Sequence, residues 1–212
     1  MQGMNGDHPD PHMVMTSLAP PQPGDRWRAE QIVRTVRAAM AKYKDYHVAL
    51  ADGFRIFAPE FPGRQKHFTN WRYAAQAQRR FDPARPTSLL YDRMPGGGWK
   101  LVGAMFTAPL WYTLAQLNER VPLSVARWHR HVNFCFPPKA VMRQIRRLRG
   151  PSGLIDPAAR RRFLHFFRIA GEPACEQVGG RWVPQLFGWM VHVYPYSKNP
   201  WHLAPGMEAP EN

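Results

Sequence analysis

The residues best suited to chemistry lie in one nine-residue segment, 127–135, with the sequence RWHRHVNFC. Read as a β-strand, this segment directs alternate side chains to opposite faces. One face is then polar, and the other is mainly large and apolar, as expected for a strand whose back lies against a core. Two imidazoles at positions i and i+2 of a strand can converge on one metal ion. The polar face holds Arg127, His129, His131, Asn133 and Cys135.

Two further histidines stand in comparable surroundings. His67 lies in the segment KHFTN (66–70), and His192 interrupts an apolar strand expected at 187–195, where it shares a face with Met190 and Tyr194. Neutral imidazole is the commonest protein ligand for metals, and three imidazoles with an open position are normal for zinc, copper or iron. The sequence therefore predicts a transition-metal site. Its candidate ligands are His67, His129, His131 and His192, with Asn133 and Tyr194 as groups that orient imidazoles or bound water.

A purely structural interpretation of the same histidines stays open. His129 and His131 are then polar strand residues that face solvent, and His192 is a core histidine hydrogen-bonded to a backbone carbonyl. The sequence does not decide between the two interpretations. It contains no H-E-x-x-H motif of the kind that binds zinc on a helix.

Two cysteines, Cys135 and Cys175, allow three interpretations. They form a disulfide in an oxidising compartment, bind metal as thiolates in a reducing one, or remain two buried thiols. As thiolates they are possible substitutes for a histidine ligand. Neither lies in a context typical of a thiolate nucleophile, and no G-x-S-x-G motif is present. A metal-dependent enzyme, either a hydrolase or an oxygenase, stays open as an alternative because an open metal position activates water or oxygen.

The net charge points to a different class of function. The chain carries 29 Lys and Arg against 15 Asp and Glu, a net charge of +14. Such a balance favours encounter with nucleic acid or an anionic surface, although arginines spread over the whole surface would have no such role. The basic residues cluster only at 139–168, where arginines are interleaved with phenylalanines. Phosphate contacts and aromatic stacking could act together there, so nucleic-acid binding is the alternative function. The residues concerned are Arg143, Arg146, Arg147, Arg160, Arg161 and Arg162.

The distribution of proline and hydrophobic residues predicts the domain organisation. Residues 1–24 are proline-rich without a hydrophobic period, so we expect a disordered tail there, a single globular domain at 25–197 and a loose tail at 198–212. No window approaches the ~18 consecutive apolar residues of a membrane helix. The start also lacks the apolar core of a secretory signal. We expect a cytoplasmic protein by default, and a periplasmic one if the start codon is misassigned.

Hydrophobic periodicity predicts an α+β fold. Apolar residues at helical spacing predict one long amphipathic helix over 25–51. Two β-prone runs around the PGGG turn at 95–98 predict an antiparallel hairpin. We expect the long helix to pack on a small, mainly antiparallel sheet of segments 88–92, 99–107, 124–135 and 187–195. Basic helices at 139–168 would be inserted before the last strand.

Several short motifs between residues 67 and 200 resemble a group of uncharacterised bacterial proteins. These motifs are H-F-x-N at 67–70, R-P-x-x-L-L-Y-D at 85–92, L-V-G at 101–103 and V-H-V-Y at 191–194, with N-P at 199–200. The group has no established activity, but its recurring histidines resemble ligands, which implies such a role for His67 and His192. Many members look exported. Asp92 stands where the group usually has glutamate, and the missing signal sequence is a second departure.

Overall fold

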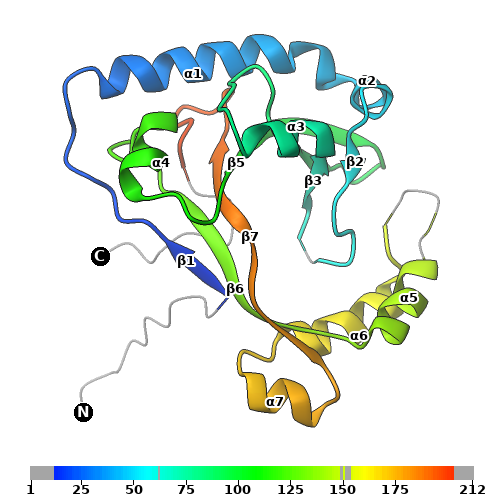
Figure 1. The fold of residues 1–212 in the computed structure, drawn as a ribbon. Coiled ribbons are helices and arrows are strands. Elements are labelled where there is room, and N and C mark those ends of the chain that lie inside the picture. The colour runs from blue at the N-terminus through cyan, green and yellow to red at the C-terminus, as the bar shows by residue number, and fades with distance from the viewer. Residues whose placement is uncertain (1–11, 62, 149, 151–153, 203–212) are drawn as a thin grey trace, which may run out of the picture.

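The computed structural model describes residues 12–61, 63–148, 150 and 154–202, and it confirms the α+β class (Figure 1). The centre of this described part is a seven-stranded antiparallel sheet with the order β1-β6-β7-β5-β4-β3-β2. The predicted hairpin around residues 95–98 is formed by β4 and β5. The strands are β1 (Met13–Met15), β2 (Arg55–Ile56), β3 (Gln65–Thr69), β4 (Ser88–Arg93), β5 (Trp99–Ala108), β6 (His129–Phe136) and β7 (Arg181–Val193).

The long N-terminal helix is present but shorter than predicted. It ends at Met40, and a 3-10 turn and a second helix follow, because the Asp45 side chain accepts a hydrogen bond from the His47 amide and starts a new helix. The prediction of one helix over 25–51 is therefore wrong in its second half. The helices are α1 (Asp25–Met40), η1 (Ala41–Lys44), α2 (Tyr46–Ala51), α3 (Trp71–Ala77), α4 (Leu114–Arg120), α5 (Lys139–Arg147), α6 (Pro157–Phe167) and α7 (Glu172–Gln177).

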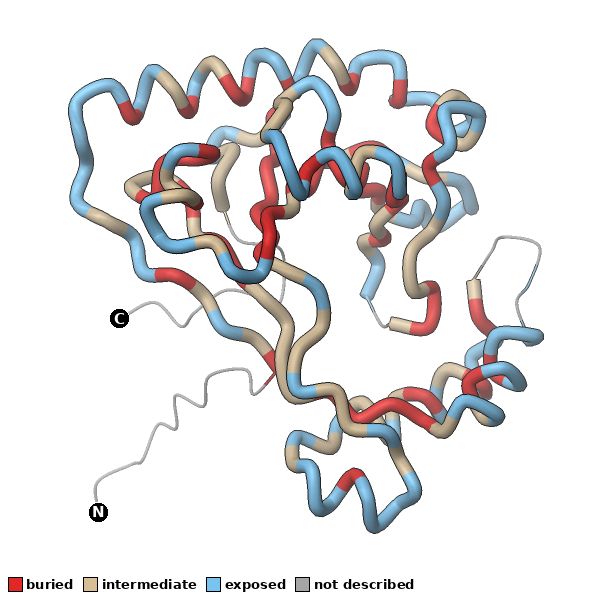
Figure 2. Tube along the Cα trace, in the orientation of Figure 1, coloured by how far each residue is buried: buried red, intermediate tan, exposed pale blue. Residues whose placement is uncertain are grey.

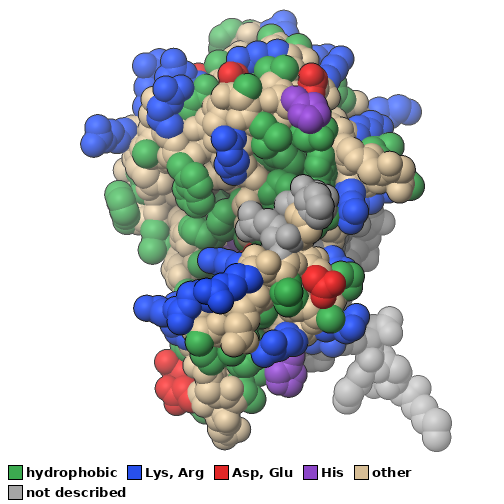
Figure 3. Space-filling view, turned by 90° about the vertical axis from the view of Figure 1, so that its right-hand side faces the viewer, with side chains coloured by type: hydrophobic (Ala, Val, Ile, Leu, Met, Phe, Trp, Pro, Cys, Tyr) green, Lys and Arg blue, Asp and Glu red, His purple; other side chains and the backbone are tan. Residues whose placement is uncertain are grey.

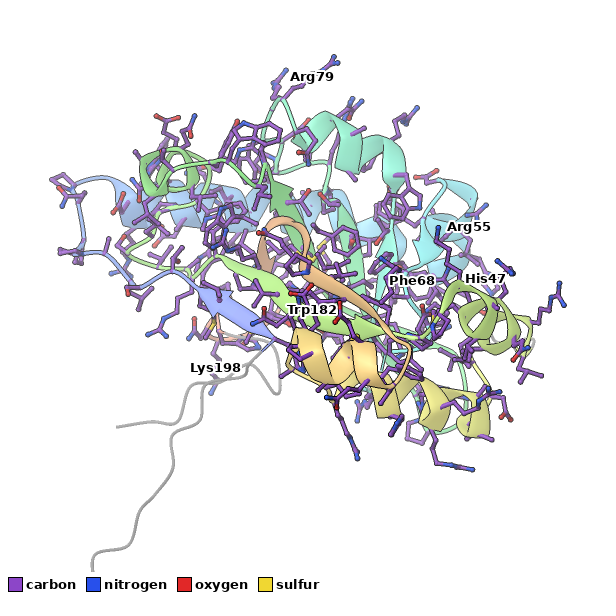
Figure 4. The ribbon with its side chains drawn as sticks, turned by 60° about the horizontal axis from the view of Figure 1, so that its bottom comes forward. His47, Arg55, Phe68, Arg79, Trp182 and Lys198 are labelled. Carbon is purple, nitrogen blue, oxygen red and sulfur yellow. A yellow bond between two sulfur atoms is a disulfide. The ribbon has the colours of Figure 1, made fainter. Side chains whose placement is uncertain are left out.

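The larger core lies between α1 and one face of the sheet. Alternate residues of β7 face it, because side chains of a strand point to opposite sides in turn. Figure 2 shows the buried residues of α1 on the side that faces the sheet. Phe68 enters the same core from β3 (Figure 4). Buried members from α1 and β7 include Ile32, Val33, Val36, Met40, Trp189, Val191 and Val193.

A smaller core lies under α5 and α6, at the other end of β6 and β7 (Figure 1). Asp156 caps α6 by accepting hydrogen bonds from the amides of Ala158 and Ala159, as the Asp-Pro sequence predicts. Phe163 is fully buried against Phe136, and Phe167 stacks on Phe134 at 5.2 Å between ring centres. The two basic helices are therefore anchored by their apolar faces, Met142 and Ile145 on α5 and the phenylalanines on α6, and most of their arginines are exposed.

The predicted tails are wrong for the residues that the structure describes. Met13–Met15 pairs with β6, and Thr16 exchanges hydrogen bonds with the Trp128 backbone, so the segment from residue 12 belongs to the sheet. At the other end the Tyr194 amide donates to the Pro200 carbonyl, and Trp201 packs against the larger core. The expected tail residues 1–11 and 203–212 lie outside the described part.

A bulge interrupts the pairing of β6 with β7. His129 pairs with Met190 and His131 with Leu186, so one residue of β6 faces three residues of β7, 187–189. Phe187 has a φ of 63°, which is rare for a bulky residue, and Asn133 has a φ of 62°. Bulges bend a strand and re-aim its side chains. The regular alternation predicted for 127–135 therefore holds for His129 and His131 but not for Asn133.

The two cysteines form a disulfide. Cys135 on β6 and Cys175 on α7 are 5.5 Å apart between Cα atoms, and the bond attaches α7 to the sheet. A Cβ at Gly180 would lie 2.5 and 2.7 Å from the two Sγ atoms, so only glycine fits beside the bond. Of the three interpretations, pairing is the one found. The prediction that either cysteine substitutes for a histidine ligand is wrong, because a disulfide sulfur is not a thiolate.

Removing the disulfide should lower the stability of the protein. The bond joins residues separated by 40 positions, and closing a loop of that length stabilises by about 4 kcal/mol in the chain-entropy treatment. We expect Cys135→Ala/Cys175→Ala to lower the free energy of unfolding in urea by about 2–4 kcal/mol. Reduced wild-type protein should match the variant. Equal stability of oxidised wild type and variant would contradict the assigned bond.

Candidate metal centre

Four histidines meet on the face of the sheet opposite α1. His67 comes from β3, His129 and His131 from β6, and His192 from β7. The sheet bends, as β6 and β7 show in Figure 1, so side chains on its inner face approach one another across intervening strands. Gly103 on β5 leaves room there, because a Cβ at this position would lie 2.8 Å from the Tyr194 ring.

The four imidazoles form a continuous chain of ring contacts with His192 and His129 in the middle. Ring centres lie 5.4 Å apart for His67 and His192, 5.0 Å for His192 and His129, and 5.4 Å for His129 and His131. The predicted meeting of His67, His192 and the 129/131 pair is thus what the structure shows.

The middle pair carries unsatisfied polar atoms. His129 is 2% and His192 7% exposed, and the Nε2 atom of each is buried with no hydrogen-bond partner. Buried polar atoms in proteins are nearly always paired, and leaving one unpaired costs about 1–3 kcal/mol. The two adjacent rings therefore each carry a buried nitrogen whose hydrogen-bonding capacity is not used by another described residue.

The surroundings of His67, His129 and His192 favour the neutral imidazole. Burial, together with the nearby His131 and Lys66, lowers the pKa of His67 to about 4. Burial also lowers the pKa of His129 and of His192 well below the ordinary value, and the neighbouring imidazoles add to the effect. A neutral imidazole has a lone pair for a metal or for a proton, so these rings are ready to ligate at neutral pH.

The donor atoms do not surround a common point as they stand. Among the described residues no group of three or more His, Cys, Asp or Glu side chains is arranged to hold a metal ion. The distances between ring centres, however, do not fix where the nitrogen atoms lie. Rotation of an imidazole about its Cβ–Cγ bond moves the nitrogens while the ring centre shifts little, and this terminal torsion has broad minima.

The two predicted orienting residues lie beside the cluster with partners of their own. Tyr194 lies 6.3 Å from His192 between ring centres, and its hydroxyl donates to Gln65 Oε1 at 3.0 Å. Burial raises the pKa of Tyr194 to about 12, so the phenol stays protonated. The carbonyl oxygen of Asn133 accepts a hydrogen bond from His12 Nδ1 at 2.9 Å. That contact ties the strand to the N-terminal segment.

A cavity of about 500 Å³ adjoins the histidines. His67 and His131, the two ends of the chain of rings, line it, whereas His129 and His192 lie behind. Its other walls come from the 57–61 loop, α3, α6 and the β7 bulge. Aromatic side chains dominate these walls, among them Phe57, Phe61, Trp71, Phe134, Phe167 and Phe187.

Sequence reasoning missed Met105 and His12 in this region. Met105 lies opposite His192, and Met190 opposite His129, so two buried thioethers share the face of the histidines. The alternation of β7 places Met190 with His192, but nothing in the sequence pairs Met105 with them. His12, expected in a disordered tail, stacks on Phe134 and Phe167 at the cavity wall.

Comparison of the chain with protein-family models, with curated proteins and with solved structures found no match. The resemblance to the group of bacterial proteins therefore stays a prediction. Interpretation of the site depends on its own geometry.

The depressed pKa values predict that the metal-free protein loses stability in mild acid. In the unfolded chain a histidine has a pKa near 6.5, whereas in the folded protein the pKa of His67 is about 4, so His67 takes up its proton only at lower pH. Stability is thus fully present above pH 6.5 and is lost as the pH falls toward 4, by up to about 1.4 kcal/mol per pH unit for each histidine. Urea unfolding with a chelator at pH 7.5, 6 and 5 measures the slope.

A single substitution separates this effect from general acid sensitivity. His192→Phe removes one such group, so its slope should be smaller than that of the wild type by up to about one proton. His165→Phe, at an exposed position on α6, should keep the wild-type slope. If all three proteins show one slope, the histidines are not held neutral by the fold.

Proposed function

We propose that this protein binds a transition-metal ion through His129 and His192, with His67 and His131 beside them. The observation that carries the proposal is that two adjacent imidazole rings each have a buried Nε2 atom without a hydrogen-bond partner. A metal ion would satisfy both at once. Neutral imidazoles supply the lone pairs, and no proton must leave them first at neutral pH.

Ring spacing supports the proposal. A metal ion lies about 2.0–2.1 Å from a ligating imidazole nitrogen and about 3.2 Å from the ring centre, so two rings at a tetrahedral ion have centres about 5.2 Å apart. The three spacings in the chain of rings are 5.0, 5.4 and 5.4 Å. The spacing of each neighbouring pair is therefore compatible with two imidazoles that share one ion. Because His192 contacts both His67 and His129, these three form the first candidate set.

The neighbouring side chains favour copper over zinc or iron. Met105 and Met190 are the cross-strand partners of His192 and His129 and are buried on the same face. Opposite residues on neighbouring strands have Cβ atoms about 4.5–5.5 Å apart, within reach of a shared ion. Thioether and imidazole together suit Cu(I), whereas zinc sites use thiolate, imidazole and carboxylate and non-haem iron sites use imidazole and carboxylate.

The disulfide bears on where the protein works. No helix in the described part of the chain is long and apolar enough to cross a membrane. Disulfides persist in oxidising compartments and are rare in the cytosol. The Cys135–Cys175 bond therefore supports a periplasmic or otherwise extracytoplasmic setting over the expected cytoplasmic one.

Metal binding should depend on the middle histidines. We expect purified protein to bind one equivalent of Cu(I) or Zn(II) and His192→Asn to bind at least 100-fold more weakly, because one ligand is lost from the centre of the set. Metal at 100 times its dissociation constant should stabilise the wild type by about 2.7 kcal/mol, or raise its melting temperature by roughly 5–10 °C. Competition with a chromogenic chelator and thermal melts measure both.

The matched control replaces a histidine outside the cluster. His47 is exposed and lies at the periphery of the molecule (Figure 4), so His47→Asn should bind metal like the wild type. Met190→Leu should weaken Cu(I) and leave Zn(II) unchanged if the thioether is a ligand. Equal binding by His192→Asn, His47→Asn and the wild type would reject the metal centre altogether.

A metal-dependent enzyme is the extension of the same proposal. The cavity reaches His67 and His131, so an ion held by His67 together with His129 and His192 would lie next to it. A metal with an open position activates water for hydrolysis or binds oxygen. The transition metal at this site would then be the cofactor.

Binding of nucleic acid or another anionic surface is a second candidate, favoured by the arginines of α5 and α6. Arg143, Arg147, Arg161 and Arg162 are exposed, and Arg160 is half-buried. Within the described residues only Arg146 of the six forms an ion pair, with Glu60 at 2.9 Å. Figure 3 shows Lys and Arg side chains on the lower part of the molecule, where these helices lie in Figure 1. Since Phe163 and Phe167 pack inward, such binding would be electrostatic without base stacking.

A salt series tests this second function. Arg143→Ser/Arg147→Ser should reduce the slope of log affinity against log salt for random duplex DNA by roughly two, because two phosphate contacts are lost. Arg79→Ser/Arg80→Ser changes the net charge equally at exposed positions on another side (Figure 4) and should keep the wild-type slope. Binding that ignores salt, or equal slopes for both variants, would count against the helices as an interface.

A further inference from the structure

The cavity next to the histidines has the size and walls of a small-molecule site. Its volume of about 500 Å³ lies within the usual 300–1,000 Å³ of such sites. Phe57 occupies a central place in its rim, with ring contacts to Trp71 at 5.9 Å and to Phe187 at 5.3 Å. Trp71 and Phe187 are 59% and 45% exposed. Large aromatic rings left open to solvent at the mouth of a cavity indicate a surface that an apolar ligand covers.

The backbone at the mouth is arranged to present these rings. Phe187 is held at a φ of 63° within the β7 bulge. The following residue is Gly188, where a Cβ would lie 2.1 Å from the Ala108 carbonyl oxygen. Strained backbone persists only where the surrounding structure enforces it, and it is concentrated at functional sites. The tight pairing with β5 thus fixes the Phe187 ring at the opening.

The polar groups of the floor leave the body of a ligand in apolar surroundings. Thr69 hydrogen-bonds to Ser88 at 2.8 Å and Thr87 to Thr107 at 3.0 Å, so these hydroxyls satisfy one another. Met105 and Met190 add thioether side chains to the same floor. A ligand with many polar groups would find few unpaired partners on this surface.

Charge decides the nature of the ligand's head group. Among the described residues the cavity wall contains no Asp or Glu, and Lys66 is its one side chain with a formal charge. Lys66 is buried, donates to the Phe61 carbonyl, and feels the positive charges of Arg160 and Arg93 as well as the negative charge of Glu60. Because no acidic side chain of the described residues lines the cavity, a carboxylate in it would be attracted by Lys66, whereas a cation there would be repelled by the same amine.

We propose that this cavity binds an apolar organic molecule that carries a carboxylate, such as a fatty or aromatic acid, with the carboxylate toward Lys66 and the chain along the aromatic wall. The inference does not need the metal. It stands on the walls and charges of the cavity and not on the unpaired nitrogens of His129 and His192. Binding measured in the presence of a chelator therefore tests it separately from the proposed metal centre.

Three probes with one chain length and different head groups test the inference. Dodecanoate, dodecan-1-ol and dodecylammonium are titrated calorimetrically into the full chain at pH 7 with a chelator, below their aggregation concentrations. We expect dodecanoate to bind at least tenfold more tightly than dodecylammonium, with the alcohol between them. Lys66→Met should remove most of the preference for the carboxylate and keep the binding of the alcohol.

Two neighbouring alanines of α3 give a matched pair for the site itself. Ala74 lines the cavity, whereas Ala75 is exposed and does not. Ala74→Trp should reduce dodecanoate binding at least tenfold by filling the mouth, and Ala75→Trp should bind like the wild type, with melting temperatures showing that both fold. Dodecylammonium bound as tightly as dodecanoate would overturn the proposed head group. No binding of any probe, or equal loss in both tryptophan variants, would overturn the site.

Discussion

The two-sidedness of β7 is the constraint on which the rest of the structure depends. Its odd-numbered residues Trp189, Val191 and Val193 enter the core under α1, so Met190 and His192 must point to the other face. A slip by one residue would place an imidazole in the larger core and a valine at the cluster. The free energy of burying these apolar side chains, about 1.5–3 kcal/mol each, therefore fixes the position of His192 as well as the fold.

The cluster follows from strand order and not from proximity in the chain. β7 lies between β5 and β6, which brings His192 next to His129, and the bend of the sheet brings His67 across from β3. The bulge opposite Arg130 then lets His131 face the cavity while Phe187 reaches its mouth. One irregularity in the sheet thus supplies both the outer histidine and the aromatic rim. Anchoring of α6 by Phe163 and Phe167 closes the far wall.

Much of this arrangement could be predicted from the sequence where the signal is local. The turn at 95–98 predicted the hairpin, and period-two alternation predicted that His129 and His131 share one face and that His192 lies with Met190. Long-range facts could not be predicted in this way. The strand Met13–Met15, which pairs with β6, is only three residues long and gives no clear local signal. The prolines around it suggested a disordered tail instead. The sequence left open whether the two cysteines pair, because a disulfide, a metal site and two buried thiols all fit them. Met105 joins the site only through the register of β5 with β7.

The central claim is that the buried imidazoles are ligands, and X-ray absorption at the metal edge tests it most directly. Protein loaded with one equivalent of Cu(I) should show two or three nitrogen neighbours at about 2.0 Å with the outer-shell scattering of imidazole rings, and a sulfur neighbour if a methionine takes part. The His129→Asn/His192→Asn variant should lose the imidazole signal. A spectrum of the wild type without imidazole scattering would contradict the account, because the metal would then be bound elsewhere.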